Sequence, residues 1–130
     1  MAPRDAMTAP REGSIGLLLA LICVLLAQHG LVNGASWWVG DDDGWDFGVE
    51  DWPTGKNFTS EDILIFKYDA DVHNVVVSSP KFYGGCDITK ESVIHQSGMD
   101  EIQLIPGPNY FFCGRLGHCQ KGVRMIVNAK

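Results

Sequence analysis

Short β-rich runs separated by turn-forming residues are the feature of this sequence that most constrains its fold. The runs recur roughly every ten residues, with Asp, Gly and Pro clusters such as "DDDGW" and "IPGPN" between them. This spacing is typical of a sandwich or barrel, so we expect one all-β sandwich domain. A short helical turn is also expected at 79–86. The expected strands are 36–40, 62–68, 73–79, 91–96, 100–104, 110–113 and 123–128.

The N-terminal part of the chain has the pattern of a leader. A basic start precedes the uncharged run "IGLLLALICVLLA". That run fits the apolar region of a secretory signal peptide and is shorter than the about 20 residues that a membrane span needs. Small residues offer a cleavage point just before Ser36. We therefore expect a signal peptide over 1–35 and one mature domain over 36–130.

The C-terminus and the charge of the chain limit its location and partners. After "VRMIVNAK" there is neither the polar spacer nor the hydrophobic tail of a lipid-anchor signal. We therefore expect a secreted protein of the extracellular space or cell wall, monomeric and without a membrane anchor. The formal net charge is −6, and no basic cluster appears in the sequence. This argues against nucleic acid or an anionic membrane surface as a partner.

The cysteines supply the first functional clue. The chain has four cysteines, and Cys23 lies in the expected leader, so three remain in the mature domain. Three thiols in an oxidising compartment suggest one disulfide and one cysteine kept for another purpose. Spacing alone leaves two pairings open. Cys86 can pair with Cys119 and leave Cys113 free, or Cys113 can pair with Cys119 and leave Cys86 free.

The stretch "FCGRLGHCQKGVRM" contains candidate metal ligands. Cys113 and His118 stand at the two ends of the loop "GRLG", whose two glycines permit a tight backbone path. Both side chains can therefore turn toward one point, and His73, at the start of the expected strand 73–79, is the best-placed third ligand. A thiolate with two imidazoles is the donor set of a trigonal copper site, because thiolate suits Cu(I) and imidazole serves both oxidation states.

Four segments together resemble the phytocyanins, the plant branch of the cupredoxins, and among them most closely the plantacyanins or basic blue proteins. The segments are "DILIFKYDADVHNVVV", "FYGGCD", "NYFFCGRLGHCQKG" and "IVNAK", and the resemblance covers the whole expected mature domain. It implies a Greek-key β-sandwich that holds one type 1 copper through His73, Cys113 and His118. It also implies that the disulfide joins Cys86 to Cys119.

Two further positions take their meaning from this resemblance. Asn74, which follows the first histidine, is expected to tighten the site through hydrogen bonds to the ligand loop. Five residues after the second histidine, plantacyanins have a weak axial methionine ligand and stellacyanins a glutamine, but this chain has Val123, which cannot coordinate. Met125 lies two residues further, displaced by about 6.6 Å along a strand. We therefore expect an apolar axial position and Met125 as core packing.

The resemblance implies single-electron transfer by a secreted blue copper protein that is not an enzyme, with electrons passing through the solvent edge of His118. Loss of the axial thioether should raise the reduction potential, because it disfavours Cu(II). The redox partner is unknown, and the acidity of the chain favours one with a basic patch. The sequon "NFT" makes Asn57 a candidate for N-glycosylation.

Two other functions stay open at this point. One is a metal-free extracellular structural or signalling module of the early nodulin-like kind, although such relatives typically lose ligands and this chain keeps three. The other is a copper protein whose main role is cell-wall interaction or guidance signalling.

Overall fold

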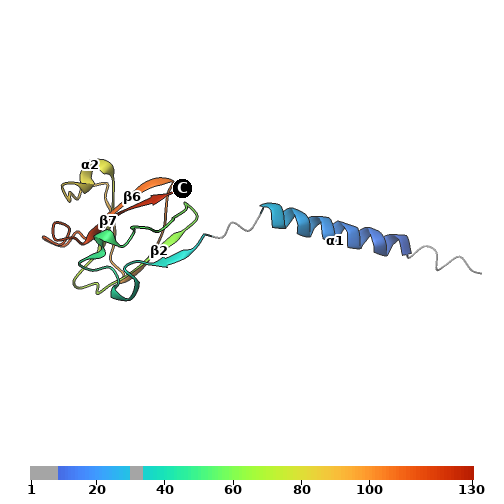
Figure 1. The fold of residues 1–130 in the computed structure, drawn as a ribbon, viewed down its shortest axis with the longest axis horizontal. Helices are drawn as coiled ribbons and strands as arrows, with labels where there is room; N and C mark the ends of the chain where they lie inside the picture. The colour runs from blue at the N-terminus through green and yellow to red at the C-terminus, as the bar shows by residue number, and fades with distance from the viewer. Residues whose placement is uncertain (1–8, 30–33) are drawn as a thin grey trace, which may run out of the picture. The chain divides into compact units, whose positions relative to one another are not determined.

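The computed structural model describes residues 9–29 and 34–130 (Figure 1). The chain divides into two compact units, with the boundary between Val32 and Asn33. The first unit contains helix α1 (Ala9–His29), which covers much of the expected leader. Within the described ranges, no helix is both long enough and apolar enough to cross a membrane. Cleavage before Ser36 stays a prediction, and the rest of the leader, 1–8 and 30–33, lies outside the described residues.

The second unit is a β-sandwich of two sheets, as expected. One sheet has the strand order β1-β2-β5 and the other β4-β3-β6-β7, so the chain crosses repeatedly from one sheet to the other. β1 and β2 run parallel, and the other paired strands are antiparallel. The strands are β1 (Ser36–Trp38), β2 (Ile63–Lys67), β3 (Val75–Ser78), β4 (Val93–His95), β5 (Met99–Gln103), β6 (Gly107–Phe112) and β7 (Arg124–Ala129).

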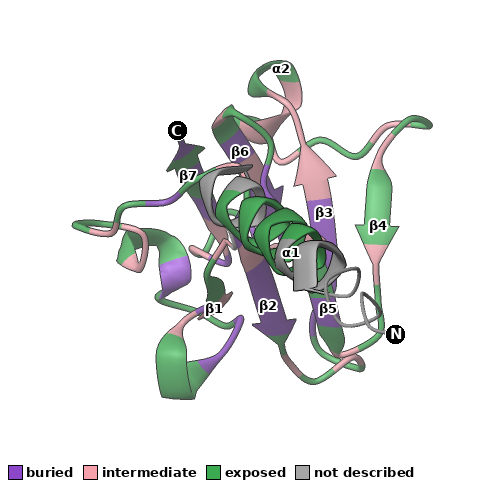
Figure 2. Cartoon of the chain, turned by 90° about the vertical axis from the view of Figure 1, so that its right-hand side faces the viewer, coloured by how far each residue is buried: buried purple, intermediate pink, exposed green. Residues whose placement is uncertain are grey.

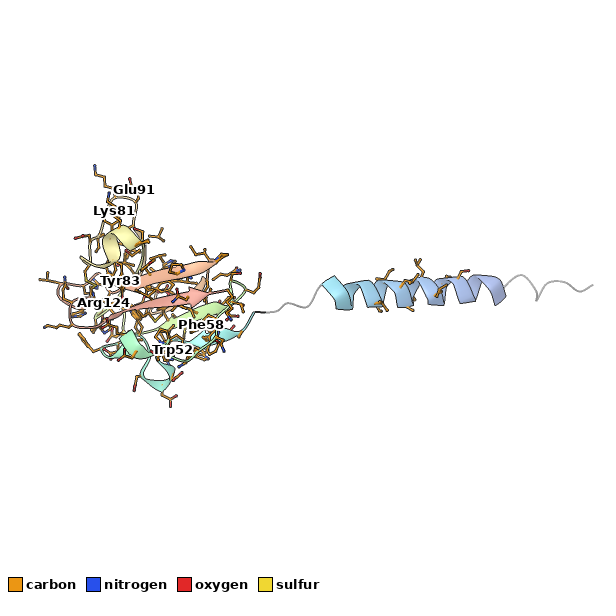
Figure 3. The ribbon with its side chains drawn as sticks, turned by 45° about the horizontal axis from the view of Figure 1, so that its top comes forward. Trp52, Phe58, Lys81, Tyr83, Glu91 and Arg124 are labelled. Atoms are coloured by element: carbon orange, nitrogen blue, oxygen red, sulfur yellow. A yellow bond between two sulfur atoms is a disulfide. The ribbon has the colours of Figure 1, made fainter. Side chains whose placement is uncertain are left out.

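Short helices fill the connections between these strands. The two 3-10 helices η2 (Asp41–Asp43) and η3 (Val49–Asp51) lie between β1 and β2. The helical turn expected at 79–86 is α2 (Pro80–Tyr83). It is held to the second sheet by its last residue, because the guanidinium of Arg124 in β7 lies 5.5 Å from the centre of the Tyr83 ring (Figure 3).

Side-chain alternation explains where the core lies. In β7, Met125, Val127 and Ala129 are buried while the residues between them are exposed, which is the period of two of a strand with one face on the core. The central residues of β2 are all buried, as expected for a strand covered on both faces. Figure 2 shows the middle of β2 buried and β4 largely exposed at the edge of its sheet.

An aromatic cluster closes the sandwich beside β1. The centre of the Phe58 ring lies 4.8 Å from that of Trp37. It lies 5.8 Å from that of Trp52, and Phe58 and Trp52 are both labelled in Figure 3. Phe58 also forms an isolated bridge with Ala129 at the end of β7. Because large aromatic rings bury much apolar area, this cluster ties the long β1–β2 connection to the core.

The domain's hydrogen bonding begins one residue before the expected cleavage point. The backbone N–H of Ala35 donates to Asp62 Oδ1 at 2.8 Å, and its carbonyl accepts from the N–H of Ile63. Asp62 is only 3% exposed and also accepts from Trp37 Nε1 and from the Thr59 backbone. Burial acts to raise the pKa of Asp62, but these hydrogen bonds outweigh it and hold the pKa below its ordinary value.

Two expected boundaries are wrong in an informative way. The strand expected at 73–79 begins only at Val75, because the N–H groups of Val72 and His73 both bond to the Asp69 carbonyl and close a turn there. Strand β6 begins inside the expected turn "IPGPN". The Asn109 side chain accepts a hydrogen bond from the Ile105 N–H group and donates one to the Ile105 carbonyl. These bonds form the turn before Gly107, where β6 begins.

Candidate metal centre

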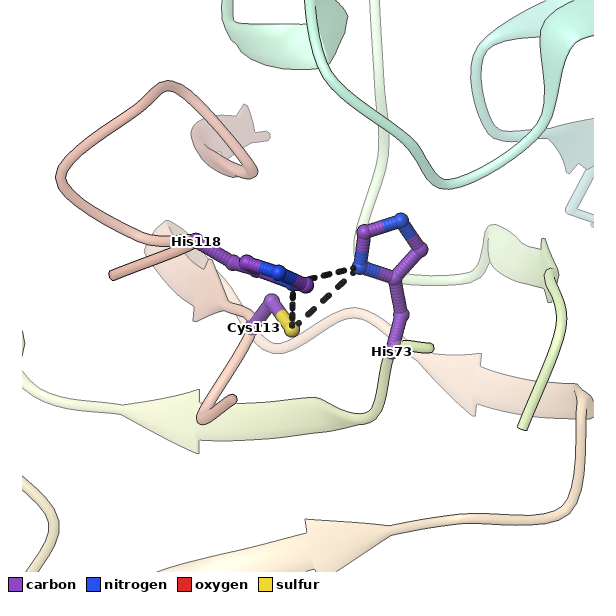
Figure 4. A group of neighbouring side chains, drawn as sticks. All are labelled: His73, Cys113 and His118. Atoms are coloured by element: carbon purple, nitrogen blue, oxygen red, sulfur yellow. Dashed lines mark hydrogen bonds between the residues drawn. The ribbon is translucent and has the colours of Figure 1, made fainter. Parts of the chain in front are cut away.

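The three expected ligands come together at one end of the second sheet. Strands β3 and β6 are antiparallel neighbours, with Val76 paired to Phe112. The start of β3 therefore lies beside the end of β6, which places His73, two residues before β3, close to Cys113, one residue after β6. His118 returns to the same point from the loop between β6 and β7 (Figure 4).

The donor atoms face one another at distances that suit a metal ion. Cys113 Sγ lies 3.5 Å from His73 Nδ1 and 3.7 Å from His118 Nδ1, and the two nitrogens are 3.1 Å apart. A triangle with these sides has its centre about 2.0 Å from each corner, close to the about 2.0–2.3 Å bonds that imidazole and thiolate make to zinc. In the described part of the chain, this is the one His, Cys, Asp and Glu group with metal-site spacing.

The chemistry of these donors favours copper. One sulfur and two imidazole nitrogens form a mixed set of soft and intermediate ligands, which suits a trigonal copper site. Cys113 is 1% exposed and His73 3%, so water reaches neither donor freely. The three donor residues therefore fit the copper ion that the sequence pattern indicates.

Backbone hydrogen bonds fix the loop that carries two of the ligands. The N–H of Cys113 donates to the Val123 carbonyl at 2.8 Å, and the N–H of Val123 donates to the His118 carbonyl at 3.0 Å. The N–H of Arg115 points at Cys113 Sγ, 3.4 Å away, and would stabilise a thiolate there. Gly117 has a φ of +79°, a conformation that other residues rarely adopt, so this tight loop needs glycine before His118.

Asn74 joins the two ligand-bearing segments, as the resemblance implies. Its Oδ1 accepts a 2.6 Å hydrogen bond from the backbone N–H of Gly114, the residue after Cys113. A Cβ atom at Gly114 would lie 2.8 Å from Ile88 Cδ1, 3.0 Å from Val76 Cγ2 and 3.1 Å from this oxygen, so all three would have to shift. The small size of glycine at this position therefore favours the close approach of the ligand loop to Asn74.

The disulfide joins Cys86 and Cys119, which settles the pairing that spacing left open. Cys113 is free and buried. Cys119 follows His118 directly and belongs to a small core cluster with Val76 and Phe112. The bridge therefore holds the C-terminal side of the ligand loop to the segment after α2.

Val123, the residue that the sequence places at the expected axial position, is buried in the core. Val123 and Met125 are both 0% exposed and belong to the same core cluster as Cys113. Met125 pairs with Phe111 in the β6–β7 ladder, and Val123 precedes the first residue of β7. Met125 is core packing, as expected.

His118 is the more accessible histidine of the pair. It is half-buried, and the neighbouring Leu116 is fully exposed. Burial lowers the pKa of His118, and the nearby His73 lowers it further. A lowered pKa keeps the imidazole neutral, which is the form that binds a metal.

Two contacts at the site have no counterpart in the sequence-based expectations. Asp46 Oδ1 lies 3.0 Å from His73 Nε2, on the side of the ring away from Cys113. The ring of Phe47 packs edge-on against both imidazoles, with centroids 5.5 Å from His73 and 5.1 Å from His118. These residues precede His73 by more than twenty positions, and no spacing rule connects them to it.

Asn57 lies apart from this centre. It is exposed, next to the buried Phe58 that packs against the tryptophans. Its position on the surface is compatible with an attached glycan, and glycosylation stays a prediction.

Comparisons with known proteins agree with this geometry. The family model described as "Plastocyanin-like domain" matches residues 38–123. Chemocyanin from Lilium longiflorum is 40% identical to this chain, and the match covers 87% of this chain and 90% of chemocyanin. Basic blue protein from Cucumis sativus is 43% identical, and the match covers 70% of this chain and 95% of that protein.

Among solved structures, cucumber basic protein, titled a blue copper protein, superposes with a TM-score of 0.71. It is 41% identical and the match covers 73% of this chain and 99% of that one. Spinach plantacyanin gives a TM-score of 0.63 at 40% identity, over 67% and 94% of the two chains. The two-sheet sandwich, the Cys86–Cys119 disulfide and the His–Cys–His group agree with these matches. This chain therefore belongs to the phytocyanin family of cupredoxins.

Proposed function

We propose that this chain is a secreted type 1 copper protein that transfers single electrons. The observation that carries the proposal is the convergence of His73 Nδ1, His118 Nδ1 and the free thiol of Cys113 on one point in a buried setting. Bound there, copper supplies a one-electron couple. The similarity to cucumber basic protein, whose title calls it a blue copper protein, supports the same assignment.

The surroundings of the three donors suit electron transfer more than catalysis. Phe47 covers both imidazoles, and Cys113 lies within the core cluster, so a substrate has little room to reach the metal. A catalytic metal site normally keeps an open position for water or substrate. We therefore propose that the protein makes and breaks no substrate bonds and is not an enzyme.

The route for electrons proposed from the sequence runs through the edge of His118. The half-buried ring lies next to Leu116, which is fully exposed, and against Phe47, which is 48% exposed. An apolar surface of this kind lets a partner approach the ring closely. Acidic Asp46 and Asp71 are exposed near the other histidine, which favours a partner with a basic patch.

Val123 defines the proposed axial position. Its buried side chain offers no donor atom, and its backbone bonds to both Cys113 and His118, so it lies against the site. A hydrocarbon there leaves three strong ligands. Cu(II) loses more from the missing thioether than Cu(I), and we expect a raised reduction potential.

The metal-free alternative is not favoured, because the chain keeps three donors and folds them to one point. A role in cell-wall interaction or guidance signalling is compatible with a copper site. Secretion and a glycan on Asn57 complete the proposal for a protein of the extracellular space.

The intense thiolate-to-copper charge-transfer band is the direct test. Cu(II) is added to the purified chain, and a strong blue absorption is expected. Cys113→Ser should abolish the band because the sulfur donor is lost, while Met125→Leu, the matched control in the core, should keep it. A folded wild-type chain that binds Cu(II) without this band, or not at all, would overturn the proposed function.

A further inference from the structure

The first copper ligand has a carboxylate on its far side. His73 turns Nδ1 toward Cys113 and His118, and its other nitrogen, Nε2, lies 3.0 Å from Asp46 Oδ1. A neutral imidazole that offers Nδ1 as a metal ligand carries its proton on Nε2. In that tautomer the Nε2–H group donates to Asp46, and the carboxylate and the metal position lie on opposite sides of the ring.

The backbone around Asp46 is anchored, although its own side chain is 53% exposed. Trp45 is 1% exposed, its N–H donates to the Lys67 carbonyl, and its Nε1 donates to the carbonyl of Asn74, next to His73. Asp46 Oδ1 also accepts from the backbone N–H of Phe47 at 2.8 Å. The carboxylate is thus oriented by its own segment before it meets His73.

The two ends of this segment show why it reaches the site. Gly44 and Gly48 both have positive φ values, +71° and +89°, which turn the chain sharply on either side of Asp46 and Phe47. A side chain at Gly44 would collide with the Lys67 carbonyl. The segment therefore bends over the two histidines as a fixed cap.

We propose that Asp46 is a positioning residue for the copper ligand His73: it selects the Nε2–H tautomer and strengthens Nδ1 as a donor. This inference rests on the proposed copper site. Carboxylate partners of metal-bound histidines fix the ring and raise its basicity in this way. None of the four segments that carry the family resemblance includes this residue.

The expected consequence is a bias toward the oxidised state. A more basic imidazole and a nearby negative charge both favour the more highly charged Cu(II) over Cu(I). Asp46 therefore lowers the reduction potential and offsets part of the rise expected from Val123. Val123 and Asp46 therefore have opposite expected effects on the reduction potential of the copper site.

A first experiment needs no copper. ¹⁵N–¹H correlation spectra of the metal-free full chain report which nitrogen of His73 is protonated. The Nε2–H tautomer should dominate in the wild type and lose its excess severalfold in Asp46→Ala. An unchanged tautomer ratio in Asp46→Ala would overturn the proposal, whether or not the chain proves to bind copper.

A second experiment measures the affinities for Cu(II) and Cu(I) and the reduction potential. Asp46→Ala should weaken the affinity for Cu(II) about tenfold. This is the lower end of the range of affinity losses for such hydrogen-bond partners, because the Asp46 carboxylate is half exposed. If the whole loss falls on Cu(II), the potential rises by about 59 mV. Asp46→Asn, which keeps the shape and a neutral acceptor, should lie between Asp46→Ala and the wild type.

Asp71→Asn is the matched control for charge. It removes an exposed carboxylate two residues from His73, and within the described residues that carboxylate makes no hydrogen bond to the ring. A smaller shift in Asp71→Asn than in Asp46→Asn supports a directed hydrogen bond. Equal shifts in the two variants would show a general effect of charge and would overturn the proposal.

Discussion

The two histidines of the site present the same atom, Nδ1, from very different surroundings. His73 is 3% exposed, precedes a central strand, and meets Asp46 through its other nitrogen. His118 is half-buried in a loop beside the fully exposed Leu116, and within the described residues no carboxylate bonds to its ring. The difference supports the proposal that His73 is held in place by its neighbours while His118 lies at the solvent edge of the site.

Removal of each imidazole ring in turn should have the largest effect on the site. In His118→Gly and in His73→Gly the blue band should disappear. Added imidazole should restore it in His118→Gly, because the vacated position is close to solvent, but not in His73→Gly, where the position is buried. Absorption spectra with and without imidazole give the readout. Equal rescue of both variants would show that the two positions are equally accessible.

Removal of the disulfide tests the support of the loop that carries His118. Cys86→Ser with Cys119→Ser opens a link between residues separated by 33 positions. On the chain-entropy model the free energy of unfolding should fall by roughly 3.5–4 kcal/mol. Urea unfolding monitored by tryptophan fluorescence measures the loss.

The same double variant should weaken the affinity for copper, because Cys119 adjoins His118. The Nε2–H tautomer of His73 should stay as in the wild type, since Asp46 is untouched. A changed tautomer would mean that the two ligands are coupled through the fold.

Val123→Met tests how strongly the residue at the proposed axial position affects the reduction potential. The larger side chain enters a fully buried position, so we expect the free energy of unfolding to fall by about 1–3 kcal/mol from overpacking. If its sulfur reaches the metal, the reduction potential falls below that of the wild type. Voltammetry of the two proteins decides, and a variant with an equal or higher potential would contradict the proposed effect of Val123.

Asn74→Ala should have the smallest effect on stability. It removes the acceptor for the Gly114 N–H in a partly buried place, at a cost of about 1 kcal/mol in unfolding free energy. Because this bond joins the His73 segment to the Cys113 loop, the affinity for copper should also fall. Asn74→Asp keeps an acceptor oxygen and serves as the control. Equal copper affinity in Asn74→Ala and the wild type would make the residue purely structural.

Much of this site was predictable from particular residues. The spacing of Cys113 and His118 around two glycines indicated two ligands on one loop, and the family resemblance implied both His73 and the Cys86–Cys119 pairing. The displacement of Met125 by two strand residues from the expected axial position predicted core packing, and Met125 lies in the core cluster. Each of these rests on a local pattern or on a known motif.

Other features had no local signal. The turn that delays β3 to Val75 depends on hydrogen bonds from two N–H groups to the Asp69 carbonyl. The start of β6 inside "IPGPN" depends on the side chain of Asn109. In both cases the residue types allow a turn or a strand, and hydrogen-bond geometry selects between them.

The all-β pattern, the odd cysteine and the types of donor could be predicted from the residues alone, because alternation, counting and ligand chemistry are properties of residues. The contact of Asp46 with His73 and the packing of Phe47 against both imidazoles appear only in the folded chain. Their approach depends on two glycine turns and on the anchoring of Trp45 beside Asn74. Contacts between segments so far apart in the chain arise from packing, and no pattern along the sequence encodes them.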